Sequence, residues 1–196
     1  MSPSSFRRFA LPASSLLALA LSACSPAPPP ASSPVASADT AASAELARIK
    51  AEQAEQKKNL DNFDDLDFNV YSHQKWDELP RSHAQDIVVH YPDGHTTTGL
   101  AAHIEELKPM FVFAPDTRIK EHPIRIAQGN MTAVSGIIEG TFSQPMPIGE
   151  GKTLPPTHKP FKLPMLTVGV WENGVMKEEY LYWDNQALLK QIGLAQ

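Results

Sequence analysis

One stretch near the C-terminus decides the fold: Trp171-Glu172-Asn173-Gly174-Val175-Met176-Lys177-Glu178-Glu179-Tyr180-Leu181-Tyr182-Trp183-Asp184-Asn185. An Asn-Gly pair between two runs of apolar and aromatic residues is a strong signal for a tight β-hairpin turn. It predicts strands over 162–171 and 175–183. Side chains alternate along a strand. The second strand therefore has one face with Met176, Glu178, Tyr180, Tyr182 and Asp184, and another with Lys177, Glu179, Leu181 and Trp183.

Outward from this hairpin, the pattern places helices first and strands after them. Helical periodicity begins at Glu45, continues in short pieces to Pro80 and is clearest over 99–114. Further strands are expected over 87–91, 118–128 and 131–142, and a final helix over 186–192. This order predicts an α+β domain with helices on one face of a curved, mainly antiparallel sheet. The hollow between such a sheet and its helices is a natural small-molecule pocket.

The N-terminus has the features of a bacterial lipoprotein signal peptide. Arg7 and Arg8 precede the apolar run 16–21, and Leu21-Ser22-Ala23-Cys24 resembles the lipobox whose cysteine is acylated. We expect a signal peptide over 1–23, a lipid-anchored Pro/Ala/Ser linker over 24–44 and a folded domain over 45–196. The alternative is an ordinary secretory cleavage site with a free thiol. Because Ser25 follows the cysteine, the sequence resembles lipoproteins on the periplasmic side of the outer membrane.

Composition excludes several classes of protein. The chain has 196 residues, a formal charge of −5 and one cysteine. Removal of residues 1–23 takes away two arginines and no acid, so the mature chain is more acidic still. No basic stripe is available to neutralise phosphates, which argues against nucleic-acid binding. A single cysteine excludes an internal disulfide framework, and membrane contact is expected only through the lipid anchor.

The order of elements and several sequence blocks resemble one known family. The blocks are Gly140-Thr141-Phe142-Ser143-Gln144-Pro145-Met146, Pro155-Pro156-Thr157-His158-Lys159, the 171–185 stretch and Gln191-Ile192-Gly193-Leu194. Together they resemble the SnoaL-like (ester cyclase) branch of the nuclear-transport-factor-2-like superfamily over about residues 59–194. The resemblance implies an α+β cone. It also implies aldol-type ring closure that uses an aspartate and a histidine, without a metal or an organic cofactor.

The resemblance assigns Asp184 to the concave face, as the catalytic acid and base. Tyr180 and Tyr182 would wall it, and partial desolvation would raise its pKa toward neutrality. Glu178 shares that face, and the Tyr180 hydroxyl is a candidate to hold an enolate oxygen. The alternative is that Asp184 only caps the last helix, since Asp is a favoured N-cap residue.

Two histidines are further candidates for the pocket. His122 would share a strand face with Ile124 and Ile126, and His90 lies in an apolar strand; for each the alternative is a structural histidine. The other five histidines have no partner at metal-ligand spacing, so no metal site is expected. Phe111 and Trp76 are candidate substrate contacts, or else core or interface aromatics.

Two functional interpretations remain open. The first is a cofactor-independent acid–base enzyme on a small apolar carbonyl or ester substrate, with Asp184, His122 and Tyr180 at its centre. The second is a non-catalytic module of the same fold that binds a small molecule or assists assembly. Converging titratable groups in the pocket favour the first, and a purely apolar lining favours the second. Leu181 and Trp183 would form an outer apolar patch, which predicts a homodimer.

Overall fold

The structure is a computed structural model that describes residues 34–196, with side chains from residue 38 onward. The predicted signal peptide and Cys24 lie outside the described residues, so the lipid anchor stays a prediction. Helix α1 (Pro34–Asp65) begins well before Glu45, so residues 34–44, expected to be a linker without regular structure, are helical. Residues 38–55 are all exposed. Alanine-rich sequence favours helix without any burial, which explains the difference. No described helix is both long and apolar enough to cross a bilayer.

The helical segments of the folded part cover one face of the sheet. After α1 the chain continues through the π-helical η1 (Leu66–Val70) and the short 3₁₀ segments η2 (Tyr71–His73) and η3 (Trp76–Arg81). Helix α2 (Leu100–Phe113) follows the first strands, and α3 (Asn185–Gln191) ends the fold. Phe63, Leu66 and Val70 are buried, so the end of α1 and η1 supply an apolar face to the core.

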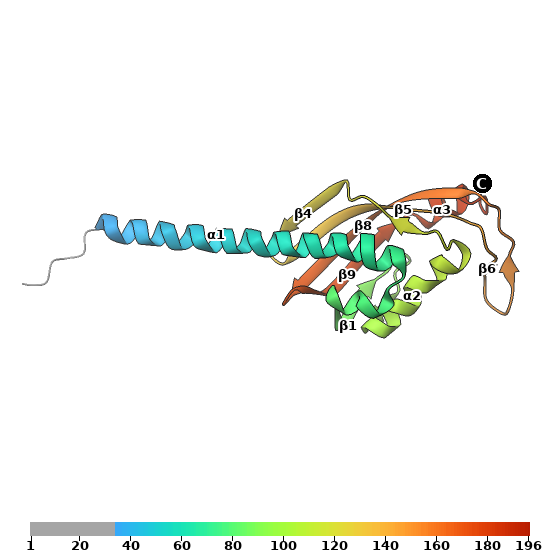
Figure 1. Cartoon of the computed structure of the whole chain (residues 1–196), viewed down its shortest axis with the longest axis horizontal. Helices are drawn as coiled ribbons and strands as arrows, with labels where there is room; N and C mark the ends of the chain where they lie inside the picture. The colour runs from blue at the N-terminus through green and yellow to red at the C-terminus, as the bar shows by residue number, and fades with distance from the viewer. Residues whose placement is uncertain (1–33) are drawn as a thin grey trace, which may run out of the picture. The chain divides into compact units, whose positions relative to one another are not determined.

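Seven strands form the main sheet, in the order β2-β1-β9-β8-β5-β3, with β4 also paired to β5. Their bounds are β1 (His83–His90), β2 (Thr96–Thr98), β3 (Arg118–Ile119), β4 (Ile124–Gln128), β5 (Met131–Thr141), β8 (Pro160–Glu172) and β9 (Val175–Trp183). A small separate pair joins β6 (Met146–Pro147) to β7 (Thr153–Leu154). Strand β1 runs parallel to β9, and the other pairs are antiparallel. The long strands β5 and β8 bend along their length (Figure 1). The predicted α+β class and curved sheet are confirmed.

The predicted β8–β9 hairpin is present, but a bulge changes its alternation. Asn173 and Gly174 have φ values of 53° and 81°, as a tight Asn-Gly hairpin turn requires. Val170 pairs with Glu178 and Trp171 with Met176, which leaves Lys177 as an extra residue. Met176 is therefore buried on the same side as Glu179 and Leu181, not with Glu178 as predicted.

From Glu178 onward the two faces of β9 alternate as predicted, but the inner and outer faces are exchanged relative to the prediction. Leu181 and Trp183 lie on the inner face, beneath the helices, where they line the pocket described below. The prediction that they form an outer patch for a partner subunit is wrong. A strand fixes which residues share a face, but one unit of register decides which face is buried.

Candidate functional site

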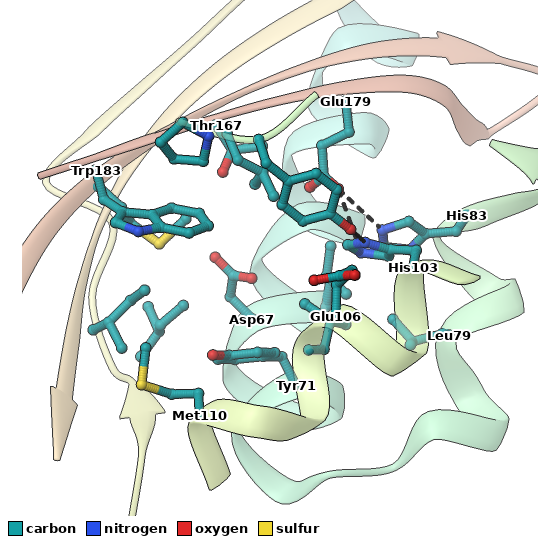
Figure 2. A pocket seen from close by; sticks show the side chains of 18 of the residues that line it. Asp67, Tyr71, Leu79, His83, His103, Glu106, Met110, Thr167, Glu179 and Trp183 are labelled. Carbon is teal, nitrogen blue, oxygen red and sulfur yellow. Dashed lines mark hydrogen bonds and ion pairs between the residues drawn. The ribbon is translucent and has the colours of Figure 1, made fainter. Parts of the chain in front are cut away.

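A pocket of about 190 Å³ lies between the inner face of the sheet and the helical segments (Figure 2). Much of its wall is apolar: Leu66, Leu107, Met110, Ile138, Met165 and Leu181. Several polar groups also face it: Asp67, Tyr71, His83, Tyr91, His103 and Glu179. A mainly apolar hollow with a few converging titratable groups is typical of a site for a small organic molecule.

The first polar group is a carboxylate that forms a hydrogen bond with a histidine outside the pocket. Asp67 lies in η1, is only 7% exposed and points into the pocket (Figure 2). Its Oδ2 is 2.8 Å from His122 Nε2, and His122 Nδ1 is 2.7 Å from Asp64 Oδ1. Arg125 Nη2 lies 2.9 Å from the other oxygen of Asp64. The chain Arg125–Asp64–His122–Asp67 thus joins the outside of the molecule to the pocket.

Burial and charge set the protonation of this chain. Burial raises the pKa of Asp67, the His122 hydrogen bond opposes that shift, and the negative charge of Glu179 adds to it. Burial alone would lower the pKa of His122, but its bonds to Asp67 and Asp64 outweigh this and raise it. A carboxylate whose pKa lies above its ordinary value is a stronger base, as proton transfer from carbon requires.

The second polar group is a buried cluster of two histidines and a glutamate, from β1, α2 and β9. Glu179 Oε2 is 3.7 Å from His83 Nε2 and 3.5 Å from His103 Nε2. The two imidazole rings stack with centroids 5.2 Å apart. Burial lowers the pKa of His103 to about 4, although the nearby carboxylate opposes that shift. His103 is therefore neutral near pH 7. We call this set the His–His–Glu cluster.

The comparison with protein families matches this chain over residues 53–192 to the SnoaL-like polyketide cyclases. The chain belongs to that family. Of the curated proteins compared with it, none matches. The predicted family is confirmed, and it covers the whole pocket-forming part of the chain.

Solved structures of the same fold agree with this assignment. IdmH of Streptomyces antibioticus, proposed to be a polyketide cyclase, is 22% identical, with a TM-score of 0.59 over 69% of this chain and 98% of IdmH. A SnoaL-like protein of Jannaschia sp. is 15% identical, with a TM-score of 0.61 over 71% and 94%. A proposed cyclase of Acidithiobacillus ferrooxidans is 19% identical, with a TM-score of 0.58 over 72% and 96%. At these identities the likeness shows the fold.

Within this SnoaL-like domain, Asp184 lies outside the pocket. It is exposed, and its Oδ1 accepts the Ala187 N–H at 3.0 Å at the start of α3. The expectation that this carboxylate sits in a desolvated chamber is therefore wrong. The alternative interpretation, that Asp184 is the N-cap of the last helix, is the one the structure supports, because the carboxylate satisfies an N–H that has no partner within the helix.

Four other predicted residues gather on the outer face of the sheet. Glu178 Oε1 accepts the Tyr180 hydroxyl at 2.8 Å and lies 2.8 Å from His90 Nε2. The His90 and Tyr180 rings stack, with centroids 4.3 Å apart. Tyr182 lies on the same strand and is 52% exposed. These residues do form a cluster, but it faces away from the pocket because of the register of β9.

The remaining predicted residues lie near the pocket without lining it. Phe111 and Trp76 pack edge-to-face with each other and with Tyr71. His122 reaches the pocket only through Asp67. None of the eight predicted catalytic and substrate-binding residues, all within the described part of the chain, lines the pocket.

The residues that do face the pocket left weak signals in the sequence. Asp67 stands between Leu66 and Phe68, and it lies three residues after Asp64, which puts both carboxylates on one helix face. His103 lies between Leu100 and Leu107 on the apolar stripe of its helix. In both cases the available signal for a pocket residue was a polar side chain on the apolar face of a helix. The partner of Asp67 lies 55 positions further along the chain, so spacing could not reveal it.

Proposed function

We propose that this SnoaL-like protein is an acid–base enzyme that acts on a small, mainly apolar carbonyl or ester compound, with Asp67 as the base. It would remove a proton from the carbon next to the carbonyl group and return it elsewhere, as cyclases and isomerases do. In this proposal Asp67 replaces Asp184, and His122 has the role of a positioning residue.

The observation that carries this proposal is the buried Asp67 carboxyl at the pocket wall. Burial raises its pKa, which strengthens the base, while the hydrogen bond to His122 fixes its orientation. Asp64 in turn holds the second ring nitrogen of His122, so the ring cannot turn away. A base held in one orientation next to an apolar hollow supports a role in general-base catalysis.

Tyr71 supplies a donor for the oxygen on which negative charge develops. It lines the same pocket, and burial together with the charge of Asp67 raises the pKa of its hydroxyl. The hydroxyl therefore stays protonated and is available to donate a hydrogen bond to an enolate oxygen. The pocket volume of about 190 Å³ is below the range of about 300–1,000 Å³ that is typical of sites for drug-sized ligands, which favours a small substrate.

The alternative of a purely binding module would fit a pocket without titratable groups. The convergence of Asp67, Tyr71 and the His–His–Glu cluster on one hollow favours chemistry instead. Lipidation of Cys24 and a periplasmic location remain part of the proposal, and both rest on the N-terminal sequence features. A homodimer also remains a proposal, but Leu181 and Trp183 no longer support it because both line the pocket.

Exchange of carbon-bound hydrogen tests the proposal with model compounds in place of the natural substrate. The full chain is incubated in D₂O with a panel of small ketones and esters, and loss of the α-proton signal is followed by NMR. We expect catalysed exchange with at least one compound, a rate that falls as the pH drops through a pKa above 3.8, and a loss of at least about 100-fold in Asp67→Asn.

Asp184→Asn serves as the matched control, because asparagine is also a good N-cap and the side chain lies outside the pocket. Its exchange rate should equal that of the wild type. Full activity in a folded Asp67→Asn variant would rule out the role proposed for Asp67.

A further inference from the structure

The His–His–Glu cluster contains buried polar atoms that have nothing to bind within the described chain. The side chains of His83, His103 and Glu179 are 1%, 3% and 5% exposed. Among the described residues, His83 Nε2 and Glu179 Oε2 have no hydrogen-bond partner. The separations of 3.7 and 3.5 Å exceed the usual 2.7–3.2 Å of an N–H···O hydrogen bond. Such atoms cost free energy when buried, so their persistence needs a reason.

Hydrogen bonds on the far side of each imidazole aim the inner nitrogens at the carboxylate. Ser82 Oγ lies 3.1 Å from the Leu79 carbonyl oxygen, to which it donates, and 2.8 Å from His83 Nδ1. Because the hydroxyl has one hydrogen, His83 Nδ1 is then the donor to Ser82, and in the neutral imidazole Nε2 carries a lone pair. The Tyr91 hydroxyl holds His103 Nδ1 at 2.8 Å. Metal-binding histidines characteristically have their second nitrogen held in this way.

We propose that His83, His103 and Glu179 bind one divalent transition-metal ion, with Zn²⁺ as the best match. Figure 2 shows Glu179 reaching from β9 toward the two histidines, and the three ligand atoms all lie within 4.8 Å of one another. A lone pair on His83 Nε2 that faces a carboxylate oxygen is an arrangement of two acceptors, which a cation placed between them relieves.

The two glutamate–histidine spacings match four-coordinate geometry. Two ligand atoms that are each about 2.1 Å from Zn²⁺ at a tetrahedral angle are about 3.4 Å apart. At a right angle, as in octahedral coordination, they would be about 3.0 Å apart. The observed 3.5 and 3.7 Å lie closer to the tetrahedral value. Two imidazoles and a carboxylate are also a ligand set that zinc enzymes use when a fourth position is left for water or substrate.

The site opens on the pocket, since all three residues line it together with Thr167, whose buried hydroxyl has no partner among the described residues. Binding of the ion goes beyond the proposed function and does not depend on it. Only its chemical use rests on that function: an ion here would polarise a substrate carbonyl whose neighbouring carbon gives its proton to Asp67.

Titration with zinc chloride tests the site. The full chain, purified without a histidine tag and stripped with a chelator that is then removed, is titrated by calorimetry. We expect one ion per chain with micromolar or tighter affinity, and at least about 10–100-fold weaker binding in His103→Gln and in Glu179→Gln. Co²⁺ loaded at the same site should give the intense visible absorption of four-coordinate cobalt, and Glu179→Gln should abolish it.

The outer cluster supplies the matched controls, His90→Gln and Glu178→Gln, because the same residue types meet there at the surface. Their zinc affinity should stay within about twofold of the wild type. Absence of a stoichiometric ion, or equal binding in Glu179→Gln and wild type, overturns the site. If the buried variants do not fold, the wild-type chain decides: zinc must raise its melting temperature, and no rise overturns the proposal.

Asp67→Asn separates this inference from the proposed function. That variant should bind zinc like the wild type while losing hydrogen exchange. If exchange survives in Asp67→Asn, only the role of Asp67 is contradicted. If Asp67→Asn loses exchange but the wild-type chain binds no zinc, only the metal site is contradicted.

Discussion

Glu178 and Glu179 are neighbours on strand β9, yet they lie in opposite environments. Glu178 faces outward, where it meets His90 and Tyr180 at hydrogen-bond distance, and those contacts lower its pKa. Glu179 faces inward, is 4% exposed, and stands 3.5 Å or more from the two histidines beside it. Each glutamate has histidine neighbours, but only the inner one has an oxygen, Oε2, that is buried without a hydrogen-bond partner among the described residues.

The contrast shows that residue types in a cluster say little about its function until burial is known. Exposed charges that pair on a surface gain little, because water competes for both partners. Buried polar groups that remain unpaired cost free energy, and proteins retain that cost mainly at functional sites. The inner face is therefore the place to look for chemistry, and the variants below compare the two faces directly.

The largest effect is expected from paired truncations on β9. Leu181→Ala removes a buried side chain from the inner face and should lower the free energy of unfolding by about 2–3 kcal/mol. Tyr182→Ala, at the next position on the outer face, should cost less than about 1 kcal/mol because that side chain is half exposed. Urea unfolding followed by fluorescence measures both. Equal losses would contradict the face assignment.

The second prediction compares two histidines, His122 behind the pocket and His90 on the outer face of the sheet. His122→Gln should lower the rate of hydrogen exchange by about 10–100-fold, whereas His90→Gln should leave it unchanged. The hydrogen bond from His122 lowers the pKa of Asp67, so its loss raises that pKa. The base must be ionised to act, so the acidic limb of the pH–rate profile should move to higher pH. An unmoved profile would mean that His122 has only a structural role.

A smaller effect tests Asp184 at the end of β9. Asp184→Ala should destabilise the protein by about 1 kcal/mol through loss of the N-cap, and Asp184→Asn should be nearly neutral. Thermal unfolding of both variants gives the comparison. A loss of activity in Asp184→Asn at unchanged stability would restore this residue to the active site.

The smallest effect concerns Glu139, on the outer side of β5. Hydrogen bonds from Lys120, Arg118 and Lys162 lower the pKa of Glu139 to about 2, despite opposition from burial. A folded-state pKa below the ordinary 4.5 stabilises the protein above pH 4.5, and this contribution disappears as the pH falls through about 2. Glu139→Gln should therefore cost about 0.5–1 kcal/mol at pH 7 and nothing near pH 2, with a smaller loss in high salt. Denaturant unfolding at the two pH values measures this.

Local signals predicted much of the fold. The Asn173-Gly174 turn, the helix ending near Ala114 and the strands around the hairpin all appear near their expected positions. The grouping of Glu178, Tyr180 and Tyr182 on one face was also predicted correctly. The choice of that face as the inner one was wrong, because nothing local distinguishes the two sides of a strand that carries apolar residues on both.

The sequence by itself determined the order of helices and strands, the family and the tight turn, because each depends on neighbouring residues or on short blocks of residue types. Tertiary structure alone decided which carboxyl groups lost their water. Asp67 contacts His122, which lies 55 positions later in the sequence. Glu179, His83 and His103 come together from three separate elements, β9, β1 and α2. The physical reason is that burial and convergence depend on the whole packed sheet and its bulge, and no short window of sequence contains them.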